Sequence, residues 1–83
     1  MGNTATAKYL TTVVRPAAEF IGNYIFYNID MLYSGFDSEE AIINDIYREV
    51  KERYPDLDQE RAEKIIRHKW GKLNTKRLAV NPE

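Results

Sequence analysis

The segment AAEFIGNYIFYNIDMLYSG, residues 17–35, decides the fold that the sequence predicts. At 100° per residue it forms one very wide apolar face. The centre of that face is Ala18, Ile21, Ile25 and Leu32, and its flanks are Tyr24, Phe26, Ile29, Met31 and Tyr33. A narrow polar stripe lies opposite, made of Glu19, Asn23, Asp30 and Ser34. The apolar arc spans roughly 240°, whereas packing on one side of a core needs only ~100°. We therefore expect a central helix that is covered on two sides, by its own chain or by another.

Apolar residues at helical spacing also precede this segment, between Lys8 and Arg15. Pro16 interrupts the pattern, because proline lacks a backbone donor and disfavours helical geometry at the residue before it. Two arrangements fit the pattern. One is a single long helix kinked at Pro16, and the other is a short helix followed by a second helix with Pro16 in its first turn. We expect the second arrangement.

A new helix is predicted directly after the central one. Gly35 is expected to end the central helix in the left-handed conformation. Asp37 and Glu40 have the spacing of a capping box, which predicts a helix over residues 38–53. Pro55 then forbids continuation. The expected core face of this helix is Ile43, Ile46, Tyr47, Val50 and Tyr54.

The last helix is expected over residues 59–70, with Asp56 or Asp58 as its cap. Gly71 is expected to end or bend it, and one or two further helical turns can follow. Its inward positions are Ala62, Ile65, Ile66, Trp70 and Leu73, and its supporting surface pairs are Glu60 with Lys64 and Glu63 with Arg67. The predicted fold class is therefore all-α, a small three- to four-helix bundle with a C-terminal helical hairpin.

The length of 83 residues predicts a single domain over 1–83, with 1–7 as a disordered arm and 81–83 as a frayed tail. Gly2 and Thr6 fit the myristoylation pattern, but the pattern is so permissive that we expect no lipid. No secretion signal is visible, and residues 17–33 are too short and too polar to span a membrane. We therefore expect a cytoplasmic protein.

Charge is distributed unevenly along the second half of the chain. Residues 37–60 contain nine acidic and three basic residues, whereas residues 61–77 contain seven basic residues and one acidic residue. The acidic helix can neutralise the basic one, or the basic helix can contact nucleic acid. The contact residues in the second case would be Arg61, Lys64, Arg67, His68, Lys72, Lys76 and Arg77. The formal net charge of −1 favours neutralisation, so nucleic-acid binding is the alternative function.

Catalytic and metal-binding patterns are incomplete in this sequence. His68 is the only histidine, there is no cysteine, and no serine occupies the context of a catalytic nucleophile. The acidic residues between 56 and 60 resemble the start of a calcium loop. Arg61 replaces the required glycine, however, and Arg67 replaces the final glutamate. We expect no enzymatic activity, no metal and no cofactor.

Six of the ten aromatic residues lie within positions 20–36. Phenylalanine and tyrosine supply large contact areas at little entropic cost, and interfaces are enriched in them. The predicted protein-interface residues are Phe20, Tyr24, Phe26, Tyr27 and Tyr33. We expect an interaction module, either a homodimer or an adaptor or inhibitor of a larger protein. Its size is that of many accessory proteins of phages and mobile elements, which is an analogy of size only.

Overall fold

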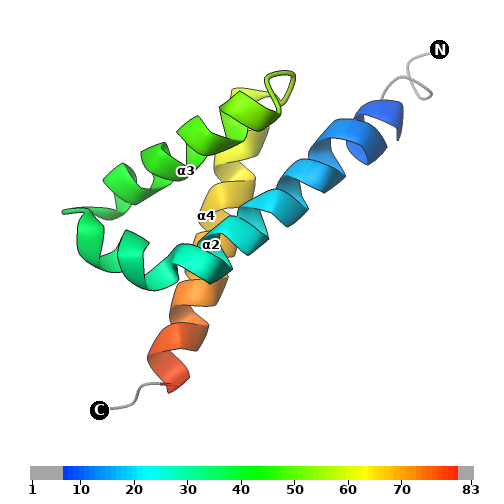
Figure 1. Ribbon diagram of the computed structural model, residues 1–83. Coiled ribbons are helices and arrows are strands. Elements are labelled where there is room, and N and C mark those ends of the chain that lie inside the picture. Colours follow the sequence, from blue (N-terminus) through cyan, green and yellow to red (C-terminus); the bar gives the residue numbers. More distant parts are fainter. Residues whose placement is uncertain (1–6, 81–83) are drawn as a thin grey trace.

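The computed structural model describes residues 7–80, and side chains up to residue 75. This part of the chain is helical and contains η1 (Leu10–Val14), α2 (Arg15–Gly35), α3 (Glu39–Arg53) and α4 (Gln59–Val80). The helices α2 and α3 form an antiparallel hairpin, and α4 crosses both of them (Figure 1). The predicted small all-α bundle is confirmed.

Some predictions fall on residues that the structure does not describe. The myristoylation pattern and the tail 81–83 lie outside the described residues, and so does the predicted arm except for Ala7. Between residues 7 and 80, no helix is both long enough and apolar enough to cross a membrane.

Side chains from α2, α3 and α4 form one hydrophobic core. The buried residues are Ala17, Ile21, Ile25, Leu32, Ile42, Ile43, Ile46, Val50, Leu57, Ala62, Ile66 and Trp70. The predicted inward residues belong to this set or are partly buried against it, as Tyr47, Tyr54, Ile65 and Leu73 are. Helical periodicity thus identified the core-facing side of each helix. Ala17 is fully buried and Ala18 is only partly buried, so the observed buried face of α2 is centred slightly differently from the predicted face.

The expected arrangement at Pro16 is confirmed in part: the short helix η1 precedes α2, which has Pro16 in its first turn, but no break separates the two. Val14 and Arg15 both have right-handed helical backbone angles, so the path is continuous from η1 into α2, with Pro16 in the first turn of α2. The amide of Arg15 donates to the carbonyl of Leu10, five residues earlier. In a regular helix the proline ring would clash with the carbonyl four residues before it, and the wider π-helical turn relieves this conflict.

The helix α2 bends at Asn28, whose backbone angles are φ −121° and ψ 16°. The Asn28 side-chain amide donates to the carbonyl of Tyr24 over 2.8 Å. The helix then continues to Gly35, which does not adopt a left-handed φ, so the predicted glycine cap is also wrong. Phe36 ends the helix instead, because it adopts an extended backbone conformation and packs its side chain against the core.

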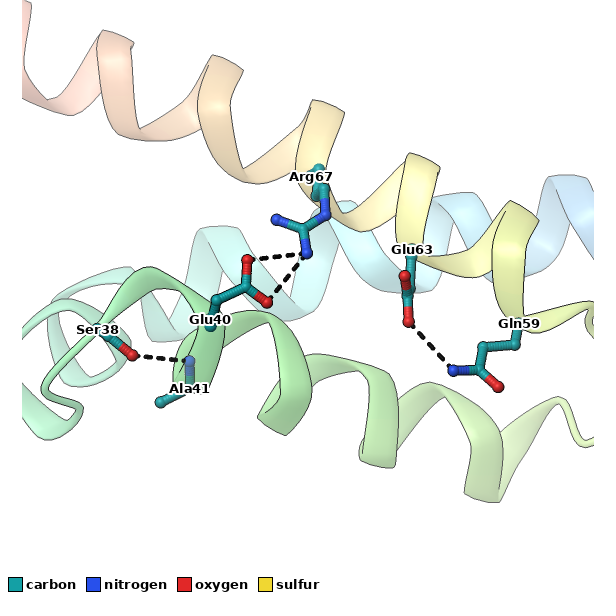
Figure 2. A network of polar contacts seen from close by, with 6 residues as sticks. All are labelled: Ser38, Glu40, Ala41, Gln59, Glu63 and Arg67. Carbon is teal, nitrogen blue, oxygen red and sulfur yellow. Dashed lines mark hydrogen bonds and ion pairs between the residues drawn. The ribbon is translucent and has the colours of Figure 1, made fainter.

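The cap of α3 lies one residue later than predicted. Ser38 has extended backbone angles, and its hydroxyl accepts a hydrogen bond from the Ala41 amide over 3.2 Å. Asp37 is therefore not the N-cap, and Glu40 takes no part in a capping box. Glu40 instead forms an ion pair with Arg67 of α4 at 2.9 Å (Figure 2).

The connection from α3 to α4 follows the prediction closely. Tyr54 ends α3 directly before Pro55, and the carboxylate of Asp58 accepts a hydrogen bond from the Arg61 amide over 3.1 Å. Asp58, and not Asp56, therefore caps α4. The same Asp58 donates its own amide to the hydroxyl of Tyr9 over 2.9 Å, which attaches the first helical turn to this connection. The helix α4 does not end at Gly71 but runs through it to Val80, so the further helical turns that the sequence allowed after Gly71 are present.

Candidate functional site

The side of α2 that faces away from the core carries the exposed aromatic residues. Six exposed side chains follow one another at helical spacing along it, and we call them the outer face of α2: Glu19, Asn23, Phe26, Tyr27, Asp30 and Ser34. Residues at these separations share one side of a helix. The buried residues Ile21, Ile25 and Leu32 occupy the opposite side and hold α2 in the core. The outer face is thus fixed in place by the packing behind it.

Phe26 and Tyr27 lie at the centre of the outer face. Phe26 is 62% exposed and Tyr27 is 78% exposed. Their ring centroids are 5.2 Å apart at an interplanar angle of 82°, an edge-to-face contact that aromatic pairs prefer. Met31 is also 55% exposed, one helical turn after Tyr27. Sequence reasoning counted Met31 as part of the apolar arc and missed it as a surface residue.

The predicted interface residues Phe20 and Tyr24 turn towards α3. Both are partly buried against the core. The ring of Phe20 lies 6.1 Å from the ring of Tyr54, and the guanidinium of Arg53 lies 4.7 Å from the Phe20 ring centroid. These contacts belong to the packing between α2 and α3. The structure therefore separates Phe20 and Tyr24 from Phe26 and Tyr27.

Tyr24 also makes a polar contact with α3. Its hydroxyl donates to the carboxylate of Asp45 over 3.1 Å. Burial of the phenol raises the pKa of Tyr24 to about 12, and the hydrogen bond to Asp45 and the negative charges of Asp45 and Glu49 act in the same direction. Tyr24 is thus a neutral hydrogen-bond donor at physiological pH.

Tyr33, the fifth predicted interface residue, lies at a different place. It is 49% exposed and lines a cavity of about 520 Å³ beside the turn between α2 and α3. The other lining residues are Phe36, Asp37, Ser38, Glu39, Ile42, Trp70 and Asn74. The five predicted aromatic residues therefore lie in three separate environments. Among these five, only Phe26 and Tyr27 face directly outward.

The predicted nucleic-acid residues lie mainly on the outward side of α4. Arg61, Lys64, His68 and Lys72 are exposed, and their spacing places them along one row. Arg61 also lies over the ring of Tyr9, with 5.9 Å between its guanidinium and the ring centroid. Lys76 and Arg77 continue α4, but their side chains lie outside the described part.

The acidic helix neutralises only part of this basic surface. In the described part of the chain, one ion pair joins α3 to α4, between Glu40 and Arg67 (Figure 2). Glu63 accepts a hydrogen bond from Gln59 instead of the predicted pair with Arg67. Lys64, His68 and Lys72 form no ion pair among the described residues. The expected neutralisation by α3 is therefore limited to Arg67.

The described residues contain no group of three or more acidic or histidine side chains that could hold a metal ion. His68, the only histidine of the sequence, lies exposed on α4. In comparisons with known proteins, the chain matches no family model, no curated protein and no solved structure. The outer face of α2 and the basic row of α4 are thus the two candidate functional surfaces of the described chain.

Proposed function

We propose that this protein is a small non-catalytic module that binds another protein chain through the outer face of α2. The observation that carries the proposal is the exposure of two adjacent large aromatic side chains, Phe26 at 62% and Tyr27 at 78%, on a helix whose other side is fully packed. Exposed apolar patches of this kind mark interaction sites in soluble proteins.

The local packing supports this assignment over a purely structural role. The core is complete without Phe26 and Tyr27, because Ile21, Ile25 and Leu32 fill the inward side of α2 with no exposure. Phe26 and Tyr27 form a pair that is already ordered by its edge-to-face contact. An ordered aromatic pair loses little entropy when a partner covers it, which is the property of residues that dominate binding energy.

The test is a capture experiment with the full chain as bait, combined with measurement of its own association state. Phe26→Ser with Tyr27→Ser is expected to reduce binding by at least about a hundredfold, since two central anchors typically contribute several kcal/mol. Leu10→Ser is the matched control, because Leu10 is 39% exposed on η1, away from the outer face. Equal binding by wild type and the double variant would contradict the proposal.

A second candidate function is binding of a nucleic-acid backbone by α4. The observation that favours it is the basic row Lys64, His68 and Lys72, which forms no ion pair within the described part of the chain. A labelled random duplex is the probe. Retention of the duplex at low salt, its release as salt rises, and its loss in Lys64→Glu with Lys72→Glu would support this function. No duplex binding at low salt would rule it out.

A further inference from the structure

We propose that the cavity beside the turn between α2 and α3 binds the guanidinium group of an arginine side chain from another protein chain. Its volume of about 520 Å³ is that of a typical ligand pocket. The end of α2, the start of α3 and the middle of α4 all contribute to its lining. None of the lining residues belongs to the outer face of α2, so this inference is independent of the proposed function.

The charged residues that line the cavity are acidic. Asp37 and Glu39 carry carboxylates, both side chains are exposed, and no basic residue is among the described lining residues. Neither carboxylate forms an ion pair within residues 7–75, where the two ion pairs join Arg48 to Asp45 and Arg67 to Glu40. Carboxylates of one sign gathered at a concave surface attract cations. The ligand is therefore expected to carry a positive charge.

The start of α3 borders the same cavity, and the start of a helix on its own attracts anions. The Ser38 hydroxyl already accepts the hydrogen bond of the Ala41 amide there, over 3.2 Å. An anion would also lie beside the carboxylates of Asp37 and Glu39, which repel it. The local charges thus favour a cation over an anion.

A buried acceptor at this cavity lacks a donor. The side-chain oxygen Oδ1 of Asn74 is buried and accepts no hydrogen bond in the described part of the chain. Proteins rarely leave such an atom unpaired, because the lost hydrogen bond to water is not replaced. Asn74 lines the cavity, so a ligand with N–H groups would supply the missing donor. The orphan oxygen therefore indicates a ligand that donates hydrogen bonds.

The aromatic lining distinguishes between the two cationic side chains that donate hydrogen bonds. Tyr33, Phe36 and Trp70 line the cavity together with the polar groups. A guanidinium group stacks on aromatic rings and presents five N–H donors in one plane, which can reach carboxylates and an amide oxygen together. A lysine ammonium has three donors and holds its hydration more strongly. Arginine is thus the side chain that this lining fits.

The first test uses the fluorescence of Trp70, which is the only tryptophan of the sequence and lines the cavity. The full chain is titrated with N-acetyl-arginine amide and with N-acetyl-citrulline amide, which has the same shape but no charge. We expect a saturable change with the arginine compound and at least about tenfold weaker binding of the citrulline compound. No saturable change up to about 50 mM, or equal affinity for both compounds, would overturn the proposal.

A third titration distinguishes a protein chain from the free amino acid as the source of the guanidinium. Free arginine carries an α-carboxylate that the acidic lining repels, so we expect it to bind more weakly than the capped amide. Tighter binding of free arginine would overturn the assignment to another protein chain.

The second test removes the charge of the cavity. Asp37→Asn with Glu39→Gln is expected to weaken binding of the arginine compound at least about tenfold. The matched control is Asp56→Asn with Glu60→Gln, which removes the same charge from two exposed residues that do not line the cavity. An equal loss of affinity in both double variants would show a general effect of net charge and overturn the site.

The third test separates binding from a structural role of Asn74. Leucine has a similar shape but no acceptor, so Asn74→Leu is expected to keep or raise the urea midpoint of the free protein. The same variant is expected to bind the arginine compound at least about tenfold more weakly. A lower midpoint would show that the oxygen is already satisfied in the free protein, and unchanged affinity would show that it contacts no ligand. Either result overturns the role of Asn74 in the proposed site.

Discussion

The hydroxyl of Tyr24 is the donor of a hydrogen bond that joins α2 to α3 through Asp45. Tyr24→Phe is expected to lower the free energy of unfolding by about 1 kcal/mol at neutral pH, the typical contribution of such a bond. Asp45 keeps its ion pair with Arg48 at 3.2 Å, which limits the loss. Urea unfolding of both proteins measures the difference, and equal midpoints would show that the bond adds no stability.

The raised pKa of Tyr24 gives this contribution a defined pH dependence. The folded pKa of about 12 lies above the ordinary value of 10.0, so the unfolded state loses the proton first. The stabilisation is therefore complete below pH 10 and decreases as the pH rises towards 12. The stability difference between wild type and Tyr24→Phe should shrink over this range, since other groups titrate alike in both proteins. A difference that stays constant from about pH 9 to about pH 12 would contradict the assignment.

Gly22 lies on α2 where α4 crosses it, beside the side chain of Lys69. A methyl group added at Gly22 would lie 3.6 Å from Nζ of Lys69 and 3.7 Å from its Cδ, which is ordinary van der Waals contact. Alanine also restricts the unfolded chain and favours helix. We expect Gly22→Ala to raise the free energy of unfolding by about 0.5–1 kcal/mol. A lower urea midpoint would mean that α4 cannot accommodate the methyl group.

At the scale of the helices, the ends are the features that local sequence determines least. Asp37 and Ser38 are both good capping residues, and in the structure the Ser38 hydroxyl accepts the hydrogen bond from the Ala41 amide. We expect Ser38→Ala to cost about 1 kcal/mol of stability and Asp37→Ala much less. Thermal unfolding of the two variants gives the comparison, and a larger loss for Asp37→Ala would reverse the cap assignment.

Periodicity predicted which side of each helix is buried, because the helical repeat relates the sequence directly to the core. It left two arrangements open at Pro16, where the continuous passage depends on a π-helical turn, and it did not predict the bend at Asn28. Gly71 likewise remains inside α4. These features arise from the backbone of a neighbouring turn or from tertiary packing, and residue type alone does not specify them.

At the scale of the whole molecule, the sequence predicted an excess of aromatic surface on α2 but not how α3 and α4 divide it. The side chains of Phe20 and Tyr24 pack against α3, and Tyr33 lines the cavity beside the turn between α2 and α3. Phe26 and Tyr27 stayed exposed because neither helix covers that side. The candidate site thus depends on the arrangement of all three helices.

The central claim is that Phe26 and Tyr27 serve association and not the stability of the fold. The most direct measurement is the free energy of unfolding of Phe26→Ser with Tyr27→Ser, at a protein concentration too low for wild-type association. We predict a value within about 1 kcal/mol of wild type, as for surface substitutions, together with loss of association in sedimentation. A loss of about 3 kcal/mol or more, as in core truncations, would contradict the claim and place both rings in the core.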